Sequence, residues 1–403
     1  MLNFGRNGRA AFDVDAGRLL SAPEAPLALE DPLTAARSAL AGPVDFPPLT
    51  RAVVAGDRVA LALTPETPSA AELIAAVWEQ LAEREIRPED VTIVEATSPH
   101  ERQLQDPRVA LPLEVRDTVN WVIHDPEEKT ACTYLATTAS GERIYLSRLL
   151  IEADVVVSIG YTTFDPILGY SGTSSVFYPW MSSSEASLRF RGQGHLELEP
   201  GDERPLRQLT DEIAWLLGTQ FTVQSVPSAG FGTSHVVAGL CDSVLRRGMQ
   251  LLQADWELEL EERPELLVLA VDGGPQGTTW ADVGAALSTA RKIVARGGRV
   301  LLLTELAELP GPGMQLLQGA ENPDDAIRPL GKTMPADVVP ATQIAAAVDW
   351  ARVFLLSQLP GDLVEDLFMV PVDTPAEAAR LLQGEESCLL LPSAEKWFVR
   401  VTG

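Results

Sequence analysis

The chain has 403 residues, of which 46% are hydrophobic, and its formal net charge at pH 7 is −26. This length and apolar content predict a folded protein with more than one hydrophobic core and argue against disorder. So acidic a surface repels phosphate backbones, which excludes nucleic acid as a partner. A small anionic metabolite remains possible if local groups hold it.

Three cysteines, Cys132, Cys241 and Cys388, are far apart in the sequence and lack the spacing of metal ligands. They fit a reducing cytoplasmic setting best. The first residues carry no apolar run of the kind found in a signal peptide, and no segment is long enough to span a bilayer. We therefore expect a cytoplasmic protein without a membrane partner.

The first half alternates short apolar runs with helical patterns. Strands are predicted at Arg58–Leu63, Val91–Ala96, Val119–His124 and Asp154–Ile159. Ser69–Arg84 is amphipathic and predicts a helix, with Ser69 expected to cap it. This order favours a mostly parallel sheet covered by helices.

The second half changes pattern and then restarts. Phe221–Leu240 predicts two extended runs around a turn, followed by a helix at Asp242–Ala254. After a polar stretch, strands and helices alternate again, at Leu266–Val271, Trp280–Ala295, Arg299–Leu303, Ala341–Trp350, Val353–Leu356 and Pro375–Gln383.

The predicted fold class is therefore α/β, with two domains that each contain a mostly parallel sheet flanked by helices. We place the domains at residues 1–260 and 261–403, with a ligand cleft expected between them.

The loop after the strand Asp154–Ile159 is the strongest candidate for a ligand site. Loops at the carboxyl ends of parallel strands are where such folds bind ligands. Successive amides in a glycine- and hydroxyl-rich loop can hold a phosphate or carboxylate. The predicted ligand-binding residues are Gly169, Tyr170, Ser171, Gly172, Thr173, Ser174 and Ser175. The alternative is a polar turn before a helix, and as a bare pattern the loop gives only a weak signal.

Two residues are candidates for proton transfer. His100 follows the strand Val91–Ala96, where an imidazole can serve as general acid or base. The alternative is a surface histidine in a turn. Asp165 precedes Pro166 in the connection after the other strand, where an aspartate more often forms a turn.

The other histidines and a second glycine-rich loop give weaker signals. His195 lies in a glycine-rich segment and is a candidate metal ligand, although a solvated histidine is the simpler interpretation. His124 and His235 are interpreted as structural. Gly273 and Gly274 follow the strand Leu266–Val271 and are expected to face the ligand from the second domain.

Taken in order, these segments resemble the nickel-dependent lactate racemase family over nearly the whole chain. The resemblance includes the run VTIVEATSPHE around His100, the run LIEADVVVSIGY, and the motif GYSG at Gly169–Gly172 with Pro179 behind it. It continues from LLVLAVDGGP to DWARVFLLSQLP. Such enzymes interconvert the stereoisomers of 2-hydroxy acids with a nickel-pincer cofactor made from a pyridinium mononucleotide. Histidines shuttle the hydroxyl proton.

The resemblance implies roles for particular residues. His100 falls on one of the family's two acid–base histidines, and the second maps to Asp165. A carboxylate can take a proton there only if burial raises its pKa. The lysine that attaches the cofactor is replaced by Ser175. The nickel-ligand histidine maps to Arg191, and His195 would substitute only after a shift of the loop.

The resemblance thus predicts a 2-hydroxy-acid racemase or epimerase with an altered attachment site. Two alternatives stay open. One is a non-catalytic paralogue that binds a small anionic metabolite through the loop Gly169–Ser175. The other is an isomerase or lyase that uses His100 and Asp165 as a metal-free acid–base pair.

Overall fold

A computed structural model describes residues 1–403 except 21–23, 98–103, 192–197, 385 and 403. Contacts group these residues into two compact units. The unit that we call the central unit comprises Leu27–Ser228 and Gly232–Ala254. The terminal unit contains both ends of the chain and comprises Met1–Pro26, Ala229–Phe231 and Asp255–Gly403. The division into domains at residues 1–260 and 261–403 stays a prediction.

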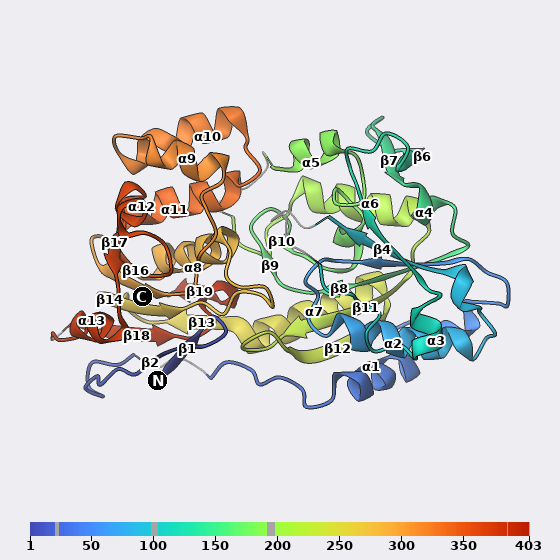
Figure 1. Ribbon diagram of the computed structural model, residues 1–403, viewed down its shortest axis with the longest axis horizontal. Helices are drawn as coiled ribbons and strands as arrows, with labels where there is room; N and C mark the ends of the chain where they lie inside the picture. Colours follow the sequence, from blue (N-terminus) through green and yellow to red (C-terminus); the bar gives the residue numbers. More distant parts are fainter. Residues whose placement is uncertain (21–23, 98–103, 192–197, 385, 403) are drawn as a thin grey trace. The chain divides into compact units, whose positions relative to one another are not determined.

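The central unit is built on a six-stranded sheet with the order β12-β11-β8-β3-β4-β5 (Figure 1). All neighbours are parallel except β12, which returns antiparallel to β11. The strands are β3 (Val59–Leu63), β4 (Val91–Ala96), β5 (Asn120–His124), β8 (Val155–Tyr161), β11 (Phe221–Pro227) and β12 (Thr233–Leu240). The predicted parallel sheet flanked by helices is confirmed here.

The helices of the central unit pack on both faces of this sheet. They are α1 (Pro32–Ala41), α2 (Ala70–Ala82), α3 (Leu113–Arg116), α4 (Arg148–Ile151), α5 (Ser184–Arg191), α6 (Pro205–Leu217) and α7 (Cys241–Trp256, whose last two residues group with the terminal unit). Short 3₁₀ turns occur at η1 (Leu49–Arg51), η2 (Pro88–Asp90) and η3 (Thr173–Val176). Two small hairpins, β6 (Cys132–Thr137) with β7 (Arg143–Ser147) and β9 (Phe164–Asp165) with β10 (Gly169–Tyr170), complete the unit.

The two faces of the sheet pack into separate cores, and the site loop belongs to one of them. Val59, Leu61 and Leu63 of β3 point into a core shared with α1 and α2. Ala60 and Ala62 point to the opposite face, into a core shared with η3, α5 and α6. The η3 turn packs on this second face and contacts β8 and β11.

The terminal unit is built on a five-stranded parallel sheet with the order β17-β16-β15-β14-β18. The strands are β14 (Leu266–Ala270), β15 (Arg299–Leu303), β16 (Arg352–Leu356), β17 (Val370–Val372) and β18 (Cys388–Leu391). Two further pairs, β1 (Leu2–Phe4) with β2 (Gly8–Ala10) and β13 (Glu257–Leu260) with β19 (Phe398–Val401), lie outside it. The helical segments are α8 (Trp280–Ile293), α9 (Pro312–Gln318), η4 (Pro323–Ala326), α10 (Ile327–Thr333), α11 (Val338–Trp350), α12 (Gly361–Asp366), α13 (Pro375–Arg380) and η5 (Ala394–Lys396).

One local prediction is wrong. Ser69 was expected to cap α2 through its side chain, but it adopts a left-handed φ of 60° and makes no capping hydrogen bond. Its hydroxyl instead lies 3.0 Å from the Oγ1 of Thr233 at the start of β12. The Ser69 hydroxyl therefore hydrogen-bonds to a residue distant in the sequence instead of capping the helix.

No helix in the described ranges combines the length and the apolar content needed to cross a membrane.

Candidate functional site

The loop after β8 folds back against the carboxyl edge of the central sheet. It contains the β9–β10 hairpin, in which Asp165 pairs with Gly169 and Phe164 with Tyr170. The chain then turns into η3, whose hydroxyl residues are buried. The sequence-predicted residues 165 and 169–175 are thus held together in one compact loop.

Asp165 closes the first turn of this loop. Its Oδ1 accepts hydrogen bonds from the backbone amides of Ile167 and Leu168, both at 2.7 Å. Burial raises the pKa of the Asp165 carboxyl, against the opposing effects of these two hydrogen bonds and of Arg204 and Arg207. Asp165 therefore forms a turn, as its position before Pro166 predicts. Its carboxyl also has the raised pKa that it would need to hold a proton.

Gly169 allows close approach between this loop and the segment before α6. Its φ is +79°, and a Cβ at this position would lie 2.2 Å from the carbonyl oxygen of Pro200. The buried Arg204 completes the contact by donating to the carbonyl oxygens of Pro166 at 2.9 Å and Glu199 at 2.9 Å. A glycine is required at position 169 by both conformation and space.

Ser175 braces the tight turn that Gly172 begins. The amide of Gly172 donates to the Oγ of Ser175 at 2.7 Å, and the amide of Ser175 donates back to the carbonyl of Gly172 at 3.2 Å. Gly172 has a φ of +111°, and a Cβ there would lie 3.1 Å from each of three oxygens, on Gln224, Thr162 and Tyr161. The hydroxyl of Ser175 is therefore engaged inside the loop.

Arg207 on α6 holds the middle of the loop from the other side. Its guanidinium donates to the carbonyl of Tyr170 at 3.1 Å and to the Oγ1 of Thr173 at 3.3 Å. It also forms an ion pair with Asp211 at 2.8 Å. Gln253 on α7 donates to the hydroxyl of Tyr170 at 2.9 Å. These contacts fix the loop from two helices that the sequence analysis had not linked to it.

Several amides of the predicted anion cradle are already paired within the chain. Besides that of Gly172, the amide of Ser171 donates to the carbonyl of Thr163 at 2.9 Å. The assignment of Gly169–Ser175 to ligand binding stays a prediction.

Of the four histidines, the structure describes His124 and His235. His100 and His195 lie outside the described residues. His124 is buried, its Nε2 lies 2.8 Å from the carbonyl oxygen of Ser182, and burial lowers its pKa. His235 pairs with Val226 within the β11–β12 hairpin. The structural interpretation of His124 is thereby supported by its surroundings.

Glu95 is a residue at this edge that the sequence analysis did not select. It is the penultimate residue of β4, is buried, and its Oε2 accepts a hydrogen bond from the indole nitrogen of Trp121 at 2.8 Å. Burial raises its pKa to about 7. A charged residue inside an apolar strand, VTIVEA, was the signal that could have found it.

Gly273 and Gly274 belong to the terminal unit and follow β14. Gly273 has a φ of +74°, and Gly274 and Gly277 exchange backbone hydrogen bonds of 2.9 and 3.0 Å. The two glycines therefore form a tight turn before α8; their predicted role toward a ligand stays a prediction.

Within the described residues, no group of three or more His, Cys, Asp or Glu side chains is arranged to hold a metal ion. Burial raises the pKa of Cys132 to about 11, of Cys241 to about 12 and of Cys388 to about 11. Because the thiolate is the nucleophilic form of cysteine, these raised pKa values disfavour a nucleophilic role for the three thiols.

Comparison with known proteins identifies relatives of the chain. Residues 10–189 match the family model described as the lactate racemase N-terminal domain. The fold is similar to that of the lactate racemase apoprotein from Thermoanaerobacterium thermosaccharolyticum, with a TM-score of 0.81, 17% sequence identity and 99% of each chain covered. It is also similar to a protein from Thermotoga maritima, with a TM-score of 0.69, 15% identity, and 95% of this chain and 100% of that chain covered. No match was found among curated proteins.

The resemblance seen in the sequence is thus confirmed over residues 10–189, which match the lactate racemase N-terminal domain, and the whole chain shares the fold of a lactate racemase apoprotein.

Proposed function

We propose that this lactate racemase-like protein acts on small 2-hydroxy acids at the carboxyl edge of the central sheet, with Asp165 as its proton-holding group. The state of Asp165 is the observation that carries the proposal. Its Oδ1 is fixed by two amides, burial raises its pKa, and no hydrogen bond to its Oδ2 is seen within the described part of the chain.

A protonated carboxyl in this position can donate a hydrogen bond to a carboxylate or hydroxyl oxygen of the bound acid. Once ionised, the same group repels an anion. Binding of a 2-hydroxy acid should therefore weaken as the pH rises through the pKa of Asp165.

The nickel-pincer cofactor that the resemblance implies does not fit the described attachment position. Ser175 has no amine with which to form the link, and its Oγ is buried and accepts the amide of Gly172. No step of the proposed chemistry is therefore routed through a covalently held cofactor.

The same observation favours a second candidate function. A paralogue that binds a small anionic metabolite without metal would keep the braced loop and the raised pKa of Asp165, and it would not need a lysine to attach a cofactor. Both hypotheses, a 2-hydroxy-acid isomerase and a non-catalytic binder, predict the same class of ligand. They differ in whether the bound ligand is converted.

Ligand binding is tested by calorimetric titration of the purified chain with L-lactate, D-lactate and 2-hydroxybutyrate between pH 5 and 8. The wild type should bind more tightly at lower pH. Asp165→Asn keeps an oxygen acceptor for the two amides and has no titrating proton, so its affinity should vary less with pH. Asp154→Asn, at the opposite end of β8, is the matched control and should behave as the wild type does. The proposal is wrong if no 2-hydroxy acid binds, or if Asp165→Asn keeps the full pH dependence.

Turnover is tested by following conversion of D-lactate to L-lactate with chiral chromatography, together with nickel content and native mass. Inversion accompanied by nickel and the added mass of a mononucleotide supports the family chemistry in a non-covalent form. Inversion without them supports a metal-free isomerase, and binding without inversion supports the paralogue.

A further inference from the structure

The order of strands in the terminal unit creates a position where ligands bind in open α/β sheets. The chain runs from β14 outward through β15 and β16 to β17 and then returns to place β18 on the other side of β14. Because β14 and β18 are parallel neighbours, the connections that follow them begin side by side at the carboxyl edge of the sheet. In open α/β sheets, ligands bind outside the carboxyl ends of strands at the point where the strand order reverses.

Ionisable side chains from both connections meet at this switch point. Asp272 follows β14, and Glu395 and Lys396 follow β18 within η5. The Nζ of Lys396 lies 2.9 Å from Asp272 Oδ2 and 3.8 Å from Glu395 Oε1. The amide of Asp272 donates to both carboxylate oxygens of Glu395, at 3.2 and 3.3 Å. All three side chains are at least 88% buried, the most exposed being Lys396 at 12%.

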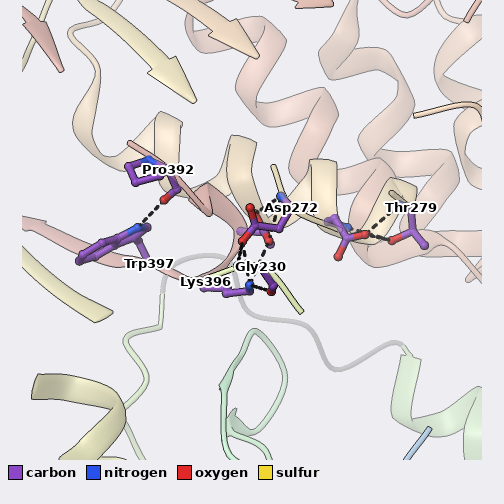
Figure 2. Close-up of polar contacts among 8 residues, drawn as sticks. Gly230, Asp272, Thr279, Pro392, Lys396 and Trp397 are labelled. Carbon is purple, nitrogen blue, oxygen red and sulfur yellow. Dashed lines mark hydrogen bonds and ion pairs between the residues drawn. The ribbon is translucent and has the colours of Figure 1, made fainter. Parts of the chain in front are cut away.

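The pair formed by Asp272 and Lys396 also holds a backbone segment. The amide of Gly230 donates to Asp272 Oδ2 at 2.8 Å, and Lys396 Nζ donates to the carbonyl oxygen of Gly230 at 2.5 Å. Figure 2 shows Asp272 and Lys396 converging on Gly230. Both polar groups of one residue are thus recognised, the N–H by a carboxylate and the C=O by an ammonium.

The surroundings of Lys396 fix its position. Its ammonium lies 5.7 Å from the centroid of the Trp256 ring, which packs edge-on against Trp397 at 5.1 Å. The indole of Trp397 donates to the carbonyl of Pro392 at 2.7 Å. A cation held over an aromatic face and against a carboxylate is pre-organised to donate to a carbonyl oxygen.

We propose that Asp272 and Lys396 form a peptide-amide binding site at this switch point, that Gly230 is its resident ligand, and that segment 229–231 is a strap which leaves the site when the pair is disrupted. The ligand class is a peptide unit, because the Asp272 carboxylate accepts from an N–H and the Lys396 ammonium donates to a C=O. Gly230 has a φ of +68°, and a Cβ there would meet nothing within 4 Å, so side-chain packing at this position does not explain the contact.

The test is hydrogen exchange of the full chain, measured by mass spectrometry on peptides that cover residues 228–232. Lys396→Met removes the donor to the Gly230 carbonyl and should speed exchange of the strap amides at least tenfold. Because this variant also leaves Asp272 as a lone buried charge, the double variant Asp272→Asn/Lys396→Met is measured as well. It carries no unpaired charge and should show the same loss of strap protection.

Arg299→Met is the matched control, since Arg299 forms a different ion pair of the terminal unit, with Glu386 at 2.9 Å. It should leave strap exchange unchanged. Amides of β14 serve as the internal reference for global unfolding. Loss of protection confined to residues 229–231 supports the strap. Unchanged protection in the double variant, or equal loss of protection in β14, overturns it.

Discussion

The amide of Gly172 donates a hydrogen bond of 2.7 Å to the buried hydroxyl of Ser175. The resemblance to lactate racemases aligns this residue with a cofactor-attaching lysine, and that alignment stays a prediction. In the structure, the serine hydroxyl braces the loop.

Ser175→Ala should destabilise the central unit, because the buried amide of Gly172 loses its acceptor. Leaving such a group unsatisfied costs about 1–3 kcal/mol. Urea unfolding followed by tryptophan fluorescence measures the change. Ser174→Ala is the control, since no hydrogen bond of the Ser174 hydroxyl is seen among the described residues, and it should have a smaller effect. Equal effects of the two variants would contradict the brace.

Gly169→Ala should destabilise the same loop for a steric reason. Its Cβ would lie 2.2 Å from the carbonyl oxygen of Pro200, and φ is +79°. The combined strain and overpacking are expected to cost about 2–4 kcal/mol. Gly201→Ala, where a Cβ meets nothing within 4 Å, should be nearly neutral in the same unfolding experiment. A neutral Gly169→Ala would show that the loop and the segment before α6 separate readily.

Glu395 should make the terminal unit less stable as the pH rises. Burial raises its pKa from 4.5 to about 8, Asp272 and Asp282 act in the same direction, and Lys396 opposes them. A raised carboxyl pKa means that the folded state holds a proton that the unfolded state has released. Its contribution is fully present below pH 4.5 and is lost as the pH rises to about 8.

The change in pKa corresponds to at most about 5 kcal/mol across this interval. Glu395→Gln should remove most of the loss, so that its free energy of unfolding varies less between pH 4.5 and 8 than that of the wild type. Denaturant unfolding at a series of pH values measures both curves. Parallel curves would show that Glu395 is ionised in the folded protein at neutral pH.

Trp121→Phe should raise the pKa of Glu95 above its value of about 7, because the indole hydrogen bond stabilises the ionised carboxylate. The titration of the Glu95 carboxyl carbon, followed by NMR, measures the change directly. A fall in the pKa would contradict the prediction and would indicate that the substitution admits water.

Much of the sheet was predictable from the sequence. Arg58–Leu63, Val91–Ala96 and Arg299–Leu303 became β3, β4 and β15 with at most one residue of difference. These segments are buried on both faces, so nearly every residue is apolar and the pattern needs no tertiary partner to be recognised. The hairpin β6–β7 was not predicted, because its strands, Cys132–Thr137 and Arg143–Ser147, are partly exposed and carry mixed polar residues.

The location of the candidate site in the chain was predictable from the sequence, but the contacts that hold it were not. The chain order of strands and glycines located the loop with Asp165 and Gly169–Ser175. It did not reveal that Arg207 and Gln253 hold this loop, since they follow it by more than thirty residues and act through folded geometry. Ser69 illustrates the same limit, because Thr233 takes a hydroxyl that local rules assign to a helix end.

The α/β class and the position of the loop after β8 follow from the sequence alone, because hydrophobic periodicity and glycine spacing are local properties. The protonation state of the ionisable groups follows only from the folded structure. Whether Asp165, Glu95 and Glu395 hold a proton depends on burial and on neighbours distant in the chain, such as Trp121 for Glu95 and Asp272 for Glu395. The free energy of a charge is set by its surroundings in space, and those exist only once the chain has folded.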